Sequence, residues 1–213
     1  AAFEPALGRA VEAAARRGTA PALLALSGGA DDGAYGAGFL AGWSTTGQRP
    51  AFSIVSGIST GALIAPYAFL GPDYDDELKA LFTGIDSKDV FTLNGLLGVF
   101  GASVTDNAPL RDIVDRQVTP DLLAAIAAEN ARGRRLLVAT TNLDAQRTVI
   151  WDMGRIASVG TPRAVEVFRE VLLASASVPA LFPPVLIEAE AGGARFDELH
   201  VDVLGVIYRF KGP

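Results

Sequence analysis

Cysteine is absent from this sequence of 213 residues, and histidine occurs once, as His200. The lack of cysteine excludes disulfide bonds and thiolate metal sites, and a single histidine excludes a histidine-rich metal centre. Acidic residues outnumber basic ones, 24 to 18, which leaves a formal net charge of −6 and no basic patch. A nucleic-acid partner is therefore not expected. No apolar run reaches the roughly 18 residues that a membrane-spanning helix requires.

Length and composition fit a single domain over residues 1–213. Half of the residues, 50%, are hydrophobic, which is enough to bury the core of one sizeable α/β domain. The sequence begins at Ala1 rather than at methionine, so we expect that any targeting segment was removed or was not included. A soluble protein without cysteine fits both the bacterial cytosol and an export route, so the compartment stays open.

The most informative stretch is the pentapeptide Gly57-Ile58-Ser59-Thr60-Gly61. An apolar run over 52–55 precedes it and is typical of a buried strand, and the apolar residues from Ala62 onward favour a helix. A serine between strand and helix, with a glycine two residues away on each side, is the pattern of a nucleophile elbow. The glycines lack the Cβ atoms that would clash where strand and helix approach each other. The alternative is an ordinary turn in which Ser59 caps the helix.

A second glycine-rich segment follows the apolar run Leu23–Leu26, which predicts another buried strand. It contains Gly28, Gly29 and Ala30, and a predicted helix over 36–43 comes next. Backbone N–H groups after such a strand can point at a ligand, so these three amides could form an oxyanion hole beside the elbow. Two other interpretations stay open. One is a dinucleotide-binding loop, whose glycine spacing is met only loosely, and the other is a turn that serves tight packing alone.

The rest of the chain alternates between helical and extended patterns. The acidic side chains over 73–77 suit the positive end of a helix dipole and are interpreted as a solvated cap rather than a metal site. An apolar, loop-like segment over 84–108 could be a flap over an apolar substrate or a covering loop without function. Further helices are predicted over 1–18, 106–118, 120–132 and 162–176. Further strands are predicted over 134–144, 148–152, 196–202 and 203–210, and the first two are expected to form a hairpin. A rigid extended segment is predicted over 182–185.

Four blocks, in this order, resemble the patatin-like phospholipase family of lipid acyl hydrolases. They are Ser27-Gly28-Gly29-Ala30-Asp31-Asp32-Gly33-Ala34, Gly57-Ile58-Ser59-Thr60-Gly61, Thr140-Thr141-Asn142-Leu143-Asp144, and Ala174-Ser175-Ala176-Ser177-Val178-Pro179 with Phe182-Pro183-Pro184-Val185 after it. The resemblance spans roughly residues 22 to 202. It implies a three-layer α/β/α domain with a mostly parallel central sheet. In such a sheet we expect the serine and the glycine block to meet at the carboxyl ends of adjacent strands.

The resemblance also implies a Ser-Asp dyad, with Ser59 as the nucleophile and Asp202 as the base that accepts its proton. The amides of Gly28, Gly29 and Ala30 would stabilise the oxyanion, and water would hydrolyse the acyl-enzyme. The implied function is a serine lipid acyl hydrolase, or esterase, that cleaves carboxylic esters of acyl lipids without a metal or organic cofactor. No calcium loop of the EF-hand kind is visible in the sequence.

The expected partner is an acyl lipid or a small ester substrate, and the oligomeric state stays open. A peripheral contact with a membrane surface is a further expectation. It rests on the apolar side chains of the loop-like segment, among them Leu96, Leu97, Val99 and Phe100.

Three departures from the family pattern bear on activity. Ala30 stands where the third oxyanion glycine is expected, and its N–H can serve only if the backbone there does not require a positive φ. Asp32 replaces a common basic residue, which removes a cation that could meet a lipid phosphate. Asp202 is followed by Val203 and Leu204 rather than by glycines. Because family domains continue well past their aspartate, we expect the sequence to be truncated or incomplete after Asp202.

Two alternative functions remain open. The three departures favour the first alternative, a lipid- or partner-binding domain that keeps the fold and has lost activity. A Ser-His-Asp esterase would instead use His200 as the base and Asp144 as the acid. Under the dyad interpretation His200 is expected on the polar face of its strand, and Asp31, Asp32 and Asp144 are turn residues. The competing interpretation of Asp202 is an exposed carboxylate at the end of a strand.

Overall fold

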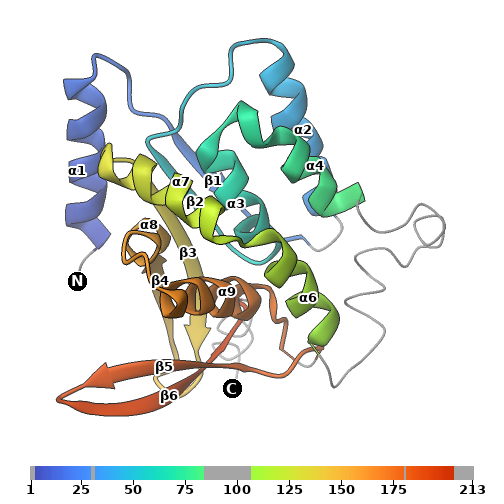
Figure 1. Cartoon of the computed structure of the whole chain (residues 1–213), viewed down its shortest axis with the longest axis vertical. Coiled ribbons are helices and arrows are strands. Elements are labelled where there is room, and N and C mark those ends of the chain that lie inside the picture. Colours follow the sequence, from blue (N-terminus) through green and yellow to red (C-terminus); the bar gives the residue numbers. More distant parts are fainter. Residues whose placement is uncertain (1–2, 30–31, 84–106, 180, 204–213) are drawn as a thin grey trace, which may run out of the picture.

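The computed structural model describes residues 3–29, 32–83, 107–179 and 181–203 of the chain (Figure 1). The helices are α1 (Phe3–Arg16), α2 (Gly33–Thr45), α3 (Thr60–Leu70), the 3₁₀ helix η2 (Pro72–Tyr74), α4 (Asp75–Thr83), α6 (Ala108–Gln117), α7 (Pro120–Ala131), α8 (Met153–Ala157) and α9 (Pro162–Ala176). The strands are β1 (Leu23–Leu26), β2 (Ile54–Gly57), β3 (Arg135–Asn142), β4 (Arg147–Asp152), β5 (Val185–Ala191) and β6 (Ala194–Val201).

The strands form one mixed sheet in the order β1-β2-β3-β6-β5, with β4 paired to β3 outside this path. β1, β2 and β3 are parallel to one another, whereas β4 and β6 are antiparallel to β3. β5 is antiparallel to β6 and therefore runs in the same direction as β3. β1, β2, β3 and β5 thus share one direction, which confirms the predicted, mostly parallel sheet.

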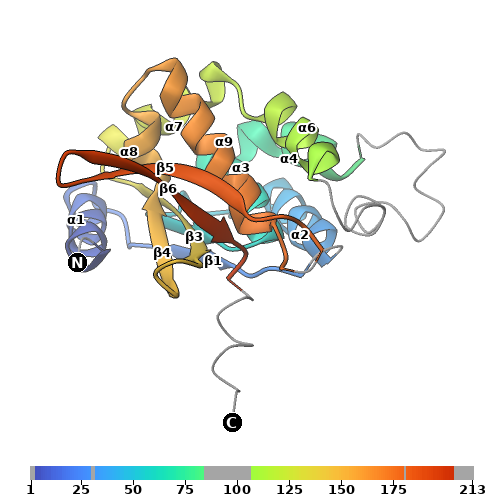
Figure 2. The same cartoon turned by 90° about the horizontal axis from the view of Figure 1, so that it is seen from below.

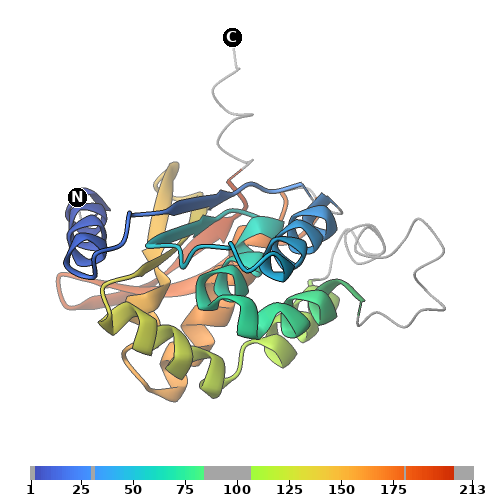
Figure 3. The same cartoon turned by 90° about the horizontal axis from the view of Figure 1, so that it is seen from above.

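The main hydrophobic core lies on one face of the sheet, beneath α3 and α9. Val55, Leu136 and Val138 belong to this core, in keeping with the alternation of side chains along a strand. Helix α3 runs through the middle of the core, and each of its residues from Thr60 to Phe69 is buried. In Figure 3 the helices coloured green to orange gather on this side of the strands.

Helix α1 covers part of the opposite face. Its Ala10 packs on Ile54 and Leu137, which alternate along their strands with the residues of the main core. Helices therefore lie on both faces of the sheet, and the predicted three-layer α/β/α architecture is confirmed. Beyond α1 this face retains exposed apolar side chains, Leu23 on β1 and Ile150 on β4.

Helices α7 and α9 begin on the same Thr-Pro signal. The hydroxyls of Thr119 and Thr161 accept hydrogen bonds from the backbone N–H three residues later. Proline occupies the first helical position of both, where no N–H is needed. The helices predicted over 120–132 and 162–176 are confirmed, as is the β3–β4 hairpin.

Two elements differ from their predictions in extent. Helix α2 begins at Gly33, three residues before its predicted start. The segment predicted only as rigid and extended over 182–185 leads into β5, which the sequence pattern does not predict as a strand. β5 joins β6 through Gly192 and Gly193, both of which have positive φ, so the hairpin turn needs residues without a side chain.

The interpretation of the acidic helix start as wholly solvated is wrong for one residue. Asp75 is buried, and its carboxylate accepts a hydrogen bond from the Arg49 guanidinium at 2.7 Å. Its neighbours Asp73, Asp76 and Glu77 are exposed, as predicted. A buried guanidinium requires a charged partner, and Asp75 is the carboxylate that meets it.

Predictions for residues 84–106 and 204–210 lie outside the described part of the chain. They include the apolar flap, the membrane contact through Leu96, Leu97, Val99 and Phe100, and the last predicted strand.

Candidate functional site

Ser59 occupies a strained turn between β2 and α3. Its backbone has φ 57° and ψ −129°, a conformation that residues with a side chain rarely adopt. Such a conformation costs on the order of 1–3 kcal/mol and persists only where the surrounding structure enforces it. A Cβ on Gly57 would lie less than 3.0 Å from the backbone of Gly61, and a Cβ on Gly61 would lie 2.7 Å from the Ser27 carbonyl oxygen. Both glycines are therefore steric requirements: Gly57 lies where strand and helix meet, as predicted, whereas Gly61 packs on the end of the neighbouring strand β1.

The hydroxyl of Ser59 makes no capping hydrogen bond, although the residue occupies the N-cap position of α3. The interpretation of this serine as a simple side-chain cap is therefore wrong. Its side chain instead lies against Gly28, where an added methyl group would be 2.6 Å from Cβ and 3.1 Å from Oγ of Ser59. The residue is buried, with 5% exposure. The N-terminus of α3 places the positive end of a helix dipole beside it.

The glycine block lies beside the elbow because β1 and β2 are parallel neighbours whose carboxyl ends leave the sheet together. The predicted meeting of the two segments at adjacent strand ends is confirmed. Gly28 contacts the serine side chain, whereas Gly29 accepts a hydrogen bond through its carbonyl from the Asp32 N–H at 2.9 Å. Ala30 lies outside the described residues. The role of the Gly28 and Gly29 amides as oxyanion donors stays a prediction.

Asp202 reaches the same region from the opposite direction. Strands β2 and β6 pair with the same edge of β3. The other edge is occupied by β4, which pairs with β3 over 137–142, a range that includes residues paired with β2 and residues paired with β6. Gly57 at the end of β2 pairs with Val138, and Val201 at the end of β6 pairs with Thr141. The two strands therefore run toward each other, and Asp202 continues β6 into the gap between them. It is fully buried there, so its interpretation as an exposed strand-end carboxylate is wrong.

The C-terminal end of α9 connects the two predicted catalytic residues. The Ser175 hydroxyl accepts a hydrogen bond from the Ser59 backbone N–H at 3.1 Å and donates one to the Ala139 carbonyl at 2.8 Å. The Ser177 carbonyl accepts a hydrogen bond from the Asp202 backbone N–H at 2.9 Å. Figure 2 shows the β5–β6 hairpin lying along α9, which explains how Asp202 arrives at this turn. Ser59 and Asp202 are thus tied to residues only two positions apart.

No role for Ser175 was predicted from the sequence. Ser175 and Ser177 belong to one of the four blocks that resemble the family, and the pattern that could have indicated a role is the pair of serines among alanines at the end of an apolar helix. The signal gives no partner, because the acceptor and donor groups of Ser175 lie in β3 and in the elbow, far away in the chain.

His200 lies in a buried cluster rather than on a polar strand face, which corrects the prediction. It is fully buried, and its ring packs edge-on against Trp151 with centroids 5.4 Å apart. Nδ1 lies 2.9 Å from the Thr140 hydroxyl, and Nε2 lies 3.1 Å from a Glu198 carboxylate oxygen. Trp151 Nε1 also donates to the Thr140 hydroxyl. Because a carboxylate only accepts, the hydrogen-bond pattern assigns the proton of the neutral ring to Nε2.

Burial lowers the pKa of His200 below its ordinary value. The hydrogen bond and the charge of Glu198, and the charge of Asp144, oppose this shift only in part. The ring is therefore neutral near pH 7. Asp144 lies in the turn between β3 and β4, where its carboxylate accepts a hydrogen bond from the Leu199 backbone N–H at 2.9 Å. The prediction of Asp144 as a turn residue is confirmed.

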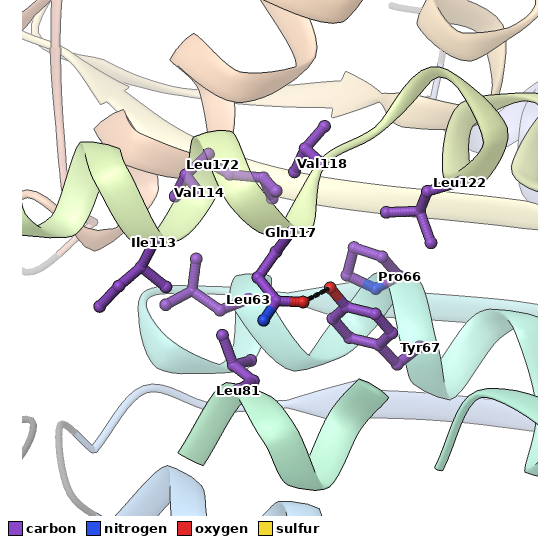
Figure 4. A pocket seen from close by; sticks show the side chains of 10 residues that line it. All are labelled: Leu63, Pro66, Tyr67, Leu81, Ile113, Val114, Gln117, Val118, Leu122 and Leu172. Carbon is purple, nitrogen blue, oxygen red and sulfur yellow. Dashed lines mark hydrogen bonds between the residues drawn. The ribbon is translucent and has the colours of Figure 1, made fainter. Parts of the chain in front are cut away.

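A small apolar cavity lies along α3 and is lined by side chains from α3, α4, α6, α7 and α9 (Figure 4). Its volume of about 10 Å³ is roughly the room that one water molecule needs, so it cannot hold an acyl chain. On its wall the Tyr67 hydroxyl donates to Gln117 Oε1 at 2.8 Å. Burial, with a smaller contribution from the charge of Glu77, raises the pKa of Tyr67. The phenol therefore stays protonated and serves as a hydrogen-bond donor.

Within the described residues, no group of three or more His, Cys, Asp or Glu side chains is arranged to hold a metal ion. In the same part of the chain, every helix is too short or too polar to cross a membrane.

A family model described as patatin-like phospholipase matches residues 24–202, a range that includes the elbow, the glycine block and Asp202. Among solved structures, the chain is similar to VipD from Legionella pneumophila, with 13% sequence identity and a TM-score of 0.42. That alignment covers 85% of this chain and 45% of VipD, so the chain spans less than half the length of VipD. No curated protein sequence matches the chain.

Proposed function

Because this chain belongs to the patatin-like phospholipase family, we propose that it is a serine lipid acyl hydrolase of the phospholipase A type. Membership supports, at the level of the family, a hydrolase that acts on lipid esters. The proposal is more specific than family membership in two respects. It assigns cleavage of carboxylic esters in acyl lipids or small esters, and it assigns the chemistry to Ser59 and Asp202 through an acyl-enzyme.

The proposed reaction has two halves. Ser59 Oγ attacks the acyl carbonyl carbon while the Asp202 carboxylate accepts its proton, and the N–H groups of Gly28, Gly29 and Ala30 stabilise the oxyanion. The tetrahedral species collapses, and the alcohol leaves with the proton held by Asp202. Water then gives a proton to Asp202 and attacks the acyl-enzyme. Collapse of the second tetrahedral species releases the fatty acid and returns the proton to Ser59.

The observation that carries the proposal is the convergence of three segments on Ser59. The strained elbow presents a hydroxyl that makes no helix cap. The backbone of Gly28 lies against that side chain, where an oxyanion donor is needed. Ser175 and Ser177 tie the elbow and Asp202 to one end of α9. A turn that served packing alone would not require a strained serine at this meeting point.

The Ser-His-Asp alternative has weaker support. Both ring nitrogens of His200 already bond to side chains, Nδ1 to Thr140 and Nε2 to Glu198. Asp144 is engaged by the Leu199 backbone. His200 would have to leave both partners and its contact with Trp151 to act as a base for the serine.

Labelling with a fluorophosphonate probe, followed by peptide mass spectrometry, tests the proposal. We expect wild-type protein to be labelled at Ser59 and Ser59→Ala to remain unlabelled. Loss of the general base in Asp202→Asn should slow labelling on the order of 10²-fold or more. His200→Gln should still be labelled, because His200 has no role in the dyad.

Undiminished labelling of Asp202→Asn would contradict the Ser-Asp dyad. A loss of labelling in His200→Gln alone would favour the Ser-His-Asp arrangement. If folded wild-type protein is not labelled at all, the inactive binding domain is the better description. Circular dichroism of each variant checks that the fold is retained. Release of fatty acid from a short-chain ester and from phosphatidylcholine then reports the substrate class.

A further inference from the structure

Helix α2 carries a row of aromatic side chains, Tyr35, Phe39 and Trp43, which we call the α2 aromatic face. Tyr35 is 78% exposed and Phe39 56% exposed, whereas Trp43 is half-buried. The ring centroids of Tyr35 and Phe39 are 6.4 Å apart, and those of Phe39 and Trp43 are 5.9 Å apart. The row ends on the buried ring of Phe52, 6.0 Å from Trp43. Each exposed ring thus contacts the next ring of a row that leads into the core.

The surroundings of these rings on α2 carry no charge. From Gly33 to Gln48 the sequence contains no Asp, Glu, Lys, Arg or His. The other exposed positions along the helix include only small residues near the rings, Ala34, Gly38 and Gly42. An exposed helix face normally carries charged and polar residues, so an uncharged aromatic face indicates a contact. A phenol, an indole and a phenyl ring suit a lipid–water interface, where apolar rings are buried and their polar groups stay hydrated.

The α2 aromatic face begins beside the candidate site. Gly33, the first residue of α2, packs so closely on Thr60 that a Cβ at this position would collide with the Thr60 side chain. Thr60 directly follows Ser59. At a rise of about 1.5 Å per residue, Tyr35 lies only about 3 Å farther along the helix axis than Gly33. A surface that touches Tyr35 and Phe39 therefore lies next to the elbow.

We propose that the α2 aromatic face docks the protein on an uncharged lipid surface, such as a zwitterionic phosphatidylcholine membrane. The docking places the candidate site against its substrate, and in this respect it rests on the proposed lipid hydrolase function. Charge disfavours an anionic surface, because Asp32 is exposed at the start of α2 and the contacting helix α4 exposes Asp76 and Glu77. The net charge of −6 acts in the same direction. Binding then depends on buried aromatic area and little on salt.

Sedimentation with phosphatidylcholine vesicles tests docking in the inactive Ser59→Ala protein, so that no lipid is consumed. Adding Tyr35→Ser and Phe39→Ser together should lower the partition coefficient on the order of tenfold or more. Adding Leu186→Ser is the matched control, because Leu186 is also 56% exposed but lies on β5, away from α2. Its partitioning should be unchanged. Circular dichroism melting checks that each protein is folded.

Equal binding of the parent and the Tyr35/Phe39 variant would overturn the proposal, as would binding that requires anionic lipid. A concentration-dependent dimer that the double substitution abolishes, without vesicle binding, would assign the face to a second copy of the chain. The test is separate from that of the hydrolase function. Vesicle binding that depends on Tyr35 and Phe39 supports docking even if the fluorophosphonate probe does not label Ser59. Labelling of Ser59 without vesicle binding supports the hydrolase function and contradicts the docking proposal.

Discussion

At the scale of single residues, the contact between Gly28 and Ser59 leaves no room for one more methyl group. In Gly28→Ala the new Cβ would lie 2.6 Å from the serine Cβ, so the elbow or the glycine block must shift. A displacement of about 1 Å can lower a rate on the order of 10²-fold, and we expect a loss of this size in the rate of fluorophosphonate labelling.

Gly8→Ala in α1 is the matched control, because a Cβ there meets nothing within 4 Å. It should label at the wild-type rate and melt at the same temperature or slightly higher, since alanine favours a helix more than glycine does. Wild-type labelling of Gly28→Ala would show that the glycine block can move without effect on the serine.

His200 gives the protein a pH dependence of stability with a definite sign. Because burial lowers its folded-state pKa below the ordinary value of 6.5, the unfolded chain takes up the proton first as the pH falls. The contribution of neutral His200 to the free energy of unfolding is fully present above pH 6.5, and it is lost as the pH falls from there toward the folded-state pKa. Urea unfolding between about pH 8 and pH 5.5 should show this loss, with a slope of at most about 1.4 kcal/mol per pH unit for one proton.

The control for this dependence is His200→Gln, which keeps a polar side chain and has no proton to take up in this range. Its unfolding free energy should be lower than that of the wild type at pH 8 and nearly constant down to pH 5.5. A wild-type dependence that persists in the variant would assign the titration to another group.

At the scale of elements, the last turn of α9 holds the elbow in place. Ser175→Ala removes the hydroxyl that bonds to both the Ser59 N–H and the Ala139 carbonyl. Unpaired buried polar groups cost about 1–3 kcal/mol, so urea unfolding should show a loss of this size. Labelling of Ser59 should slow as well, because a strained turn loses one of the contacts that enforce it.

Ser177→Ala is the comparison within the same turn. It removes only the hydrogen bond from the Ser177 hydroxyl to the Leu173 carbonyl, and it leaves the main-chain carbonyl that accepts the Asp202 N–H. We expect a smaller loss of stability and near-normal labelling. Equal effects of the two substitutions would mean that the turn acts only through its helix and not through the elbow.

At the scale of the whole molecule, a buried ion pair joins segments on the helical side of the sheet. The Arg49 guanidinium bonds to Asp75 of α4 at 2.7 Å, to the Ala68 carbonyl of α3 at 3.2 Å and to the Ser44 hydroxyl of α2 at 3.0 Å. In Asp75→Asn the guanidinium stays buried without its counter-charge. The free energy of unfolding should fall by about 3–5 kcal/mol, as measured by urea denaturation.

The next residue offers the control. Asp76 pairs with Lys79 at 3.1 Å, but its side chain is 94% exposed. Asp76→Asn should therefore change stability by less than about 1 kcal/mol. Similar losses for the two substitutions would indicate that both act through the start of α4 rather than through the ion pair.

Much of the fold follows from patterns within short stretches of chain. The helices predicted over 120–132 and 162–176 begin at the same prolines as α7 and α9, and short apolar runs predict β1 and β2. Strand β5 was not predicted, because its alternating apolar and acidic residues directly follow two prolines. Its pairing with β6 is what makes this segment a strand. Helix α2 starts earlier than predicted because Gly33 packs on Thr60, a contact that lies outside the local pattern.

The elbow is the part of the candidate site that local sequence was sufficient to predict. Gly57, Ser59 and Gly61 lie within five residues, and the steric need for Gly57 arises from its contact with the backbone of Gly61 within the same turn. The need for Gly61 arises from its contact with Leu26 of β1 and with Ser27, which only the folded chain brings close. Composition likewise ruled out disulfide bonds and thiolate metal sites, because chemistry that requires cysteine is impossible without it.

The surroundings of the elbow depended on contacts between distant parts of the chain. Ser175 bonds to Ser59 across 116 residues, and Asp202 arrives because β6 pairs with the edge of β3 that β2 also occupies. His200 looks like a polar position on an alternating strand, yet Trp151 of β4 covers it. Periodicity gives the two faces of a strand, but which face is buried is decided by the elements that pack on it, and these are set only when the whole chain folds.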